Sequence, residues 1–125
     1  MGELLLADEV YAVAGAAMEV FNELRGDYLE AVYQEAMEIE LGLRAIPFRP
    51  QVGLPIYDKG RKLNKKYVTD LPCHERLIVE IKVAGRLTTR DEAQLLNYLH
   101  VTKLRAGVLL NFGPPHKFAW KRLIA

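Results

Sequence analysis

The stretch Leu77-Ile78-Val79-Glu80-Ile81-Lys82-Val83 decides the fold, because its apolar and mostly β-branched residues predict a strand that nevertheless carries two charges. Residues two apart in a strand project to the same face. Glu80 and Lys82 therefore share one face, while the apolar residues at positions 77, 79 and 81 fill the other. The two charged side chains are placed to serve one site.

A third charged residue, Asp70, lies at the end of the preceding predicted strand. Its carboxylate would supply the second hard oxygen ligand that a Mg²⁺ ion needs beside Glu80. The ammonium group of Lys82 would hold a phosphate or an attacking water. These residue types predict metal-dependent cleavage of a phosphodiester. A surface ion pair between Glu80 and Lys82 is the alternative, and the apolar residues around the pair argue against it.

The composition is that of an ordinary globular protein. The chain has 125 residues, of which 50% are hydrophobic and 26% charged, so we expect a single domain over residues 1–125 with its own core. The formal net charge is only +1. Overall charge therefore does not favour a nucleic-acid partner, and any site for a polyanion has to be local.

Cysteine usage and the N-terminal residues predict a cytoplasmic location. Cys73 is the one cysteine, so an internal disulfide is excluded, and Met1-Gly2-Glu3 lacks the basic start of a secretory signal. No apolar run approaches the ~20 residues of a membrane span, so we expect no membrane contact. The segment Cys73-His74-Glu75 has no second cysteine at zinc-ligand spacing, and we expect it to be a solvated turn.

The residue pattern around the central strand predicts seven further elements. Two helices cover about 4–24 and 28–41, the second N-capped by Asp27 and closed by Gly42, and a third helix is capped by Thr88 or Thr89 and runs through 91–99. Strands are predicted at 52–57, 62–71, 106–112 and 117–124, the last at a sheet edge. We expect the three consecutive strands up to residue 83 to form a meander, which makes Asp70 and Glu80 neighbours.

This order and six sequence blocks resemble the PD-(D/E)XK nuclease superfamily, and more closely its small GxxExxY family. The blocks span nearly the whole chain and are Gly15-Ala16-Ala17-Met18-Glu19-Val20, Tyr28-Leu29-Glu30-Ala31-Val32-Tyr33, Tyr57-Asp58-Lys59-Gly60-Arg61, Ile78-Val79-Glu80-Ile81-Lys82, Glu92-Ala93-Gln94-Leu95-Leu96-Asn97-Tyr98-Leu99 and Leu110-Asn111-Phe112-Gly113. The resemblance implies an α/β (α+β) fold with a restriction-endonuclease-like αβββαβ core, in which helices flank a mixed sheet.

The resemblance also implies a set of site residues. It makes Asp70, Glu80 and Lys82 the signature triad, and it implies one or two Mg²⁺ or Mn²⁺ ions. The implied metal ligands are Asp70, Glu80, the backbone carbonyl of Ile81 and, directly or through water, Glu30. Two accessory residues, Gln94 and Tyr98, lie one turn apart on the third predicted helix. An exposed amide beside a packed phenol explains that pair equally well.

Two positions depart from the family pattern. Asp27 stands where the family name expects glycine, with Gly26 one residue earlier, and Thr69 stands where a proline usually introduces the first acid. Aspartate accepts left-handed or capping backbone geometry better than most residues, so we expect the turn at Asp27 to survive. Neither departure removes a metal ligand.

Two groups of basic residues are candidates for nucleic-acid contact. The first group lies on the predicted hairpin between Tyr57 and Tyr67 and consists of Lys59, Arg61, Lys62, Lys65 and Lys66. The second consists of Arg86 and Arg90, which follow Lys82. A solvated hairpin explains the first group equally well.

These observations lead to a nuclease, with DNA favoured over RNA only because the resembled superfamily acts mostly on DNA. Because the domain is small, we expect specificity to come from a homodimer or a protein partner. Two alternatives stay open, since a fold alone does not establish activity. One is a non-catalytic nucleic-acid-binding domain. The other is an interaction domain that docks a partner on the meander or on the small-residue face around Gly15 and Ala16.

Overall fold

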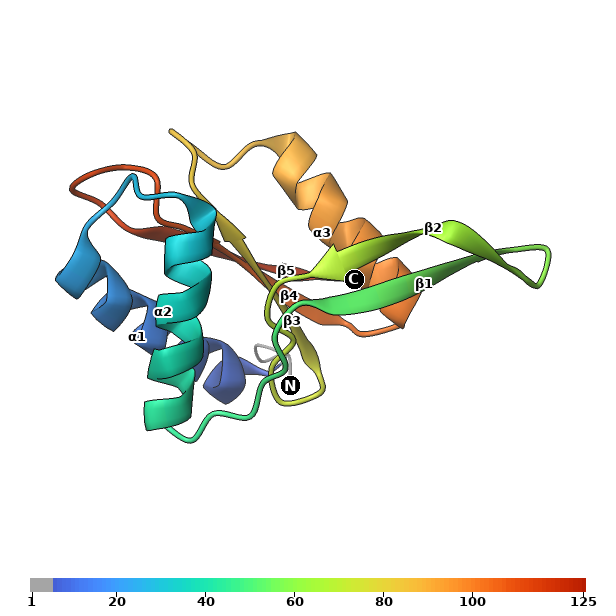
Figure 1. Cartoon of the computed structure of the whole chain (residues 1–125), viewed down its shortest axis with the longest axis horizontal. Coiled ribbons are helices and arrows are strands. Elements are labelled where there is room, and N and C mark those ends of the chain that lie inside the picture. Colours follow the sequence, from blue (N-terminus) through green and yellow to red (C-terminus); the bar gives the residue numbers. More distant parts are fainter. Residues whose placement is uncertain (1–5) are drawn as a thin grey trace.

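The computed structural model describes residues 6–125 and contains three helices and five strands in that range (Figure 1). The elements are α1 (Ala7–Leu24), α2 (Glu30–Leu43), β1 (Val52–Asp58), β2 (Arg61–Thr69), β3 (Leu77–Lys82), α3 (Thr89–Thr102), β4 (Ala106–Asn111) and β5 (Ala119–Ile124). This is the predicted order. The first two residues of the predicted helix 4–24, and Met1-Gly2-Glu3, lie outside the described residues.

A mixed three-stranded sheet forms the centre of the fold. Its strand order is β3-β4-β5, with β3 parallel to β4 and β4 antiparallel to β5, so β5 is an edge strand as predicted. A parallel pair needs a long crossover, and α3 supplies it between β3 and β4. The register places Glu80 beside Leu109 and Lys82 beside Asn111. The charged pair therefore lies on an edge strand, near its carboxyl end.

The predicted three-stranded meander is wrong. β1 and β2 pair with each other as a separate antiparallel hairpin, which extends away from the central sheet (Figure 1). The chain crosses β3 only briefly after β2 ends, where the Leu71 N–H donates to the Val79 carbonyl at 3.1 Å. Two residues further on, the Cys73 N–H donates to the Leu77 carbonyl at 2.8 Å, where β3 begins and the pairing ends. Asp70 thus meets β3 at a crossing point rather than along a paired strand.

Helices cover both faces of the central sheet (Figure 1). On one face the core joins α1 and α2 to alternate residues of β3 and β4, among them Val79, Ile81 and Val108. The small residues Ala16 and Ala17 of α1 are fully buried in this core. A surface for an outside partner built on the small-residue face of α1 is therefore not available at those two residues.

The opposite face packs against α3 and the hairpin. Leu95 and Leu99 of α3 form a second core with Ile78, Leu109 and Leu54, the last from β1. Burial of Leu54 here explains why the hairpin leaves the sheet edge, because its apolar side chain is covered by α3. Alternate side chains of β3 thus pack into two cores, one on each face of the sheet. This gives the mixed α+β, restriction-endonuclease-like arrangement.

The turn between α1 and α2 differs in detail from the prediction. Leu29 is the N-cap of α2, without a side-chain cap, so the prediction of Asp27 as N-cap is wrong, and α2 runs past Gly42 to Leu43. Asp27 has a φ of 75°, and its N–H donates to the Phe112 carbonyl at 2.9 Å. Aspartate tolerates this left-handed geometry, so the turn survives without the family glycine.

The start of α3 is the one predicted in the sequence. Thr88 is the N-cap, and it forms a capping box with Asp91, in which each side chain accepts a hydrogen bond from the other residue's backbone N–H.

Within residues 6–125, no helix combines the length and the apolar character needed to cross a bilayer.

Candidate active site

Two carboxylates are held together where the end of β2 crosses β3. Glu80 Oε2 accepts hydrogen bonds from Thr69 Oγ1 at 2.6 Å and from the Asp70 N–H at 2.9 Å. Asp70 Oδ2 accepts in turn from the Ile81 N–H at 2.8 Å. Gln34 of α2 donates to the Asp70 carbonyl at 3.0 Å and fixes the crossing from the other side. The two predicted metal ligands are thus brought together by reciprocal bonds.

Burial makes this pair of acids electrostatically costly. Glu80 is only 4% exposed, and desolvation together with the charge of Asp70 raises its pKa to about 8, against the opposing effect of its hydrogen bonds and of Lys82. Desolvation also raises the pKa of Asp70, although the Ile81 N–H and Lys82 lower it. Glu80 is buried and Asp70 half-buried, and Lys82 offsets only part of their mutual repulsion, so a bound cation would relieve the rest.

Lys82 reaches from β3 toward the N-terminal half of α3. Its Nζ donates to Gln94 Oε1 at 2.6 Å and lies 3.9 Å from Asp91 Oδ1. The ammonium group is therefore oriented by α3 and not paired directly with either carboxylate of the crossing. Gln94 is thereby brought beside Lys82.

Tyr98 lies one helical turn beyond Gln94, behind the carboxylates. Its ring contacts Tyr67 of β2, with centroids 4.9 Å apart. Burial, followed by the charges of Glu80 and Asp70, raises the pKa of Tyr98 to about 12. Its hydroxyl therefore stays protonated at neutral pH, as a hydrogen-bond donor near the two acids.

Glu30 is the first residue of α2 and belongs to the same electrostatic group. Partial burial raises the pKa of Glu30, and the charges of Asp70 and Asp91 act in the same direction. Lys82 and the Val83 N–H oppose this rise but do not cancel it. The structure thus brings the N-terminus of α2 toward the end of β3. The site draws its charged residues from β3, α2, α3 and the residue that follows β2.

Asp70 and Glu80 are the two carboxylates available to a divalent cation at the crossing. Over residues 6–125, no three or more His, Cys, Asp or Glu side chains are grouped in a way that would by itself hold a metal ion. Mg²⁺, however, usually takes only one or two carboxylates and completes its octahedron with water and substrate phosphate. The hydrogen bonds to Asp70 and Glu80 go to one oxygen of each, Oδ2 and Oε2. The two carboxylates fit such a cation.

Besides Gln34, three residues that the sequence did not assign to the site contribute to it. Thr69 is fully buried and donates to Glu80, at the position where the family usually has proline. Asp91 lies beside Lys82, and its capping pattern predicted the helix but not this contact. Asn111 is buried, and its amide bonds both the N–H and the carbonyl of Ala84 and so ties down the loop after Lys82. The only sign of this role in the sequence was that Asn111 lies in one of the six sequence blocks.

The basic residues fall into two places. Arg86 and Arg90 are exposed on the loop after β3 and the first turn of α3, next to Lys82 in the chain. The hairpin residues Lys59, Arg61, Lys62, Lys65 and Lys66 are exposed as well. Lys62 pairs with Tyr57, and Thr69 pairs with Val52, five residues away on β1, so Lys62 lies roughly 17 Å along the hairpin from the end of β2. The structure does not bring the tip of the hairpin into the site.

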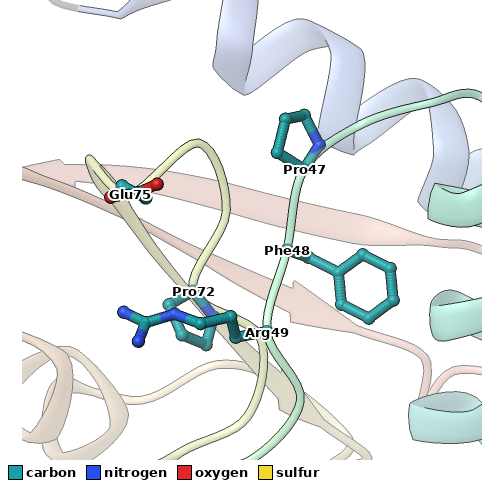
Figure 2. A pocket seen from close by; sticks show the side chains of 5 residues that line it. All are labelled: Pro47, Phe48, Arg49, Pro72 and Glu75. Carbon is teal, nitrogen blue, oxygen red and sulfur yellow. The ribbon is translucent and has the colours of Figure 1, made fainter.

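A separate small pocket lies between the chain after α2 and the turn before β3. It measures about 70 Å³ and is lined by Pro47, Phe48, Arg49, Pro72 and Glu75 (Figure 2). None of the predicted site residues takes part in it. The neighbouring Cys73 is fully buried, and burial raises its pKa to about 12, so the expectation of a solvated turn is wrong at this residue. The isolated bridges from Cys73 to Phe48 and Leu77 account for that burial.

Comparisons with known proteins agree with this geometry. The protein described as "Crystal structure of SSO0001" superposes with a TM-score of 0.59 at 19% sequence identity, over 75% of this chain and 48% of that one. At this identity the likeness concerns the fold alone, and the chain spans about half the length of that protein. No curated protein matches the sequence. A sequence model of the PD-(D/E)XK nuclease superfamily matches residues 7–123, so the chain belongs to that superfamily.

Proposed function

We propose that this protein is a divalent-metal-dependent nuclease that hydrolyses DNA phosphodiester bonds and belongs to the GxxExxY branch of its superfamily. The observation that carries the proposal is the reciprocal crossing, in which the Asp70 N–H donates to Glu80 and Asp70 itself accepts from Ile81. It holds the carboxylate of Asp70, the residue that follows β2, beside Glu80 on the edge strand that also carries Lys82. Two mutually repelling acids, one buried and one half-buried, are stabilised when a cation binds them both.

Mg²⁺ or Mn²⁺ is the cofactor in this proposal. Asp70, Glu80 and the Ile81 carbonyl would hold the ion, with Glu30 acting through water. When bound, the ion would lower the pKa of an attacking water and offset the charge that develops on the phosphate. Glu80 must lose its proton to ligate. Because its pKa lies at about 8, metal binding at neutral pH releases a proton from the site.

Lys82 is the catalytic cation of the chain itself. Its ammonium group is held by Gln94 at 2.6 Å and stands 3.9 Å from Asp91, so it reaches the site in a fixed orientation. A preorganised charge of this kind orients the attacking water and stabilises the negative charge of the transition state without reorganisation. Gln94 is a positioning residue in this scheme, and Tyr98 offers a hydroxyl donor beside the acids.

The charge distribution favours one direction of approach for a polyanion. Together α1 and α2 contain Asp8, Glu9, Glu19, Glu23, Glu30, Glu35, Glu38 and Glu40 but no lysine or arginine. The basic side chains lie elsewhere, among them Arg86, Arg90 and the hairpin set. DNA would therefore reach the carboxylates from the side of α3 and the hairpin, because the two acidic helices repel it.

The proposal also covers domain number, location and assembly. We propose that residues 1–125 form one domain that works in the cytoplasm. A domain this small has little surface for reading sequence, so a homodimer or a protein partner would supply specificity, and a dimer would present one site to each DNA strand.

The test combines metal binding with cleavage on the same samples. Mn²⁺ and Mg²⁺ are titrated calorimetrically into the wild type, Asp70→Ala and Glu80→Ala, and nicking of supercoiled and single-stranded DNA is then measured. Glu75→Ala is the matched control, an exposed acid outside the crossing. Loss of both metal binding and cleavage in the two site variants, but not in Glu75→Ala, supports the nuclease function. Metal binding that is unchanged in both variants, without cleavage, would instead leave a non-catalytic binding domain.

A further inference from the structure

A second concave site lies along α3, beyond the carboxylates. It is a groove of about 480 Å³ between the β1–β2 hairpin and α3, and its polar and aromatic lining includes Tyr57, Tyr67, Asn97, His100 and Lys103. This volume falls within the ~300–1,000 Å³ that is common for ligand sites. Except for Tyr67 through its contact with Tyr98, none of these residues takes part in the cluster of acids.

Three of the side chains that line the groove are unpartnered among the described residues, namely Tyr57, Asn97 and His100. Tyr57 is 60% exposed, and Asn97 and His100 are exposed on α3. In the part of the chain from residue 6 onward, the side chains of these three residues make no hydrogen bond, ion pair or ring contact. Single exposed aromatics are ordinary on protein surfaces. Here two rings and an amide from two separate elements line the same hollow, which is the arrangement of a binding site rather than of scattered surface residues.

The groove is continuous with the proposed active site through a pair of rings. Tyr67 lines the groove, and its ring contacts Tyr98, whose pKa responds to Glu80 and Asp70. Along α3, Gln94 and His100 are six residues apart, which is about 9 Å. Two or three nucleotides at ~3.4 Å per nucleotide span that distance. A strand whose cleaved phosphate lies at the carboxylates would thus place its next bases in the groove.

Positive charge lies at the groove and near it. Lys103 lines the groove where α3 ends. Lys65 is exposed on β2, two residues before Tyr67. Aromatic rings close to lysines are the pattern with which proteins bind single strands, because every base has a π face and every nucleotide a phosphate.

We propose that this groove binds unpaired nucleotides that flank the phosphodiester to be cut, so that the substrate is a single-stranded or partly unpaired nucleic acid. Bases stack on Tyr57 and His100, the amide of Asn97 meets base edges, and Lys65 and Lys103 pair with phosphates. The link to cleavage rests on the proposed nuclease function, whereas binding to the groove does not.

Binding is measured without metal, so that cleavage plays no part. Fluorescence anisotropy in EDTA follows labelled 12-nucleotide oligothymidylate, the matching oligouridylate and a 12-base-pair DNA duplex. Tyr57→Ala and His100→Ala are each expected to weaken oligothymidylate binding about ten-fold, with about a two-fold effect at most on the duplex. Tyr57→Phe is expected to bind like the wild type, because stacking needs the ring and not the hydroxyl.

Tyr11→Ala is the matched control, since Tyr11 is 56% exposed and lies on α1, away from the groove. Unchanged oligothymidylate binding in Tyr57→Ala and His100→Ala, or an equal loss on single strand and duplex, would overturn the proposal. Equal losses on oligothymidylate and oligouridylate support a site that reads bases and phosphates without reading the sugar. Because no metal is present, a protein that fails the cleavage test can still pass this one.

Discussion

The Asp70 N–H donates to Glu80 Oε2 at 2.9 Å, so the residue that would share a cation with Glu80 also orients its carboxylate. Thr69, the preceding residue, donates to the same oxygen at 2.6 Å. Two consecutive residues at the end of β2 thus hold one acid of β3. The site depends on where β2 ends as much as on the acids themselves.

Thr69→Val should weaken metal binding by acting on Glu80. Valine matches threonine in shape but cannot donate, so the buried carboxylate of Glu80 loses a hydrogen bond to its charged form and its pKa rises further. The pH midpoint of Mn²⁺ binding, measured by calorimetry between pH 6 and 9, should move upward. Thr89→Val, an exposed threonine on α3, is the control. An unmoved midpoint would show that the hydroxyl has no influence on the acid.

Stability without metal should fall as the pH rises. The pKa of Glu80 is raised from 4.5 to about 8 on folding, so between these values the folded state binds more protons than the unfolded state. The contribution of Glu80 to the free energy of unfolding is then greatest below about pH 4.5 and decreases up to about pH 8. Asp70 contributes in the same direction.

Thermal unfolding in EDTA across that pH range checks the sign. The wild type should melt at a lower temperature at pH 8 than at pH 5, and saturating Mn²⁺ should reduce the difference. Glu80→Gln should flatten the profile, because the amide carries no charge in either state. A wild-type melting temperature that rises with pH would contradict the raised pKa of Glu80.

Gln94→Ala should lower the cleavage rate without changing metal affinity. Gln94 accepts the hydrogen bond from Lys82 Nζ and makes no bond to either carboxylate. Its loss frees the lysine to move, and we expect about a ten-fold fall in kcat, against about 10²–10³-fold for Lys82→Ala. Single-turnover cleavage and metal calorimetry separate the two effects. Leu96→Ala, at an exposed leucine of α3, should behave as the wild type.

Gly107→Ala should destabilise the protein by about 1–3 kcal/mol. A Cβ at this position of β4 would come within 2.7 Å of Leu95 Cδ1, and Leu95 is fully buried, so its side chain has no room to withdraw. Urea unfolding gives the free energy. The cost should shrink when Leu95→Ala is added, because the two sites share one space.

Gly42→Ala is the control for that measurement. A Cβ at Gly42 meets nothing within 4 Å, and the residue lies inside α2. Alanine favours a helix over glycine by about 1 kcal/mol, so this variant should be stabilised. Equal effects of alanine at both positions would refute the close packing of α3 on β4.

Local patterns made much of the fold predictable. The β-branched run around Glu80 and the period of α1 identified their elements, and the pair Thr88 and Asp91 marked the start of α3, because strand preference, amphipathic spacing and capping act over a few neighbouring residues. The charged residues at Asp70, Glu80 and Lys82 were recognisable for the same reason. The roles assigned to them remain predictions that the experiments above test.

The sequence by itself determined which residues form helices and strands and which of them carry charge in an apolar setting. Only the tertiary structure decided that the hairpin leaves the sheet, that Thr69 donates to Glu80, and that a groove opens beside α3. These outcomes depend on contacts between residues far apart in the chain, such as Leu54 packing in the core of α3. Such contacts are chosen by the burial of whole surfaces, which no short stretch of sequence encodes.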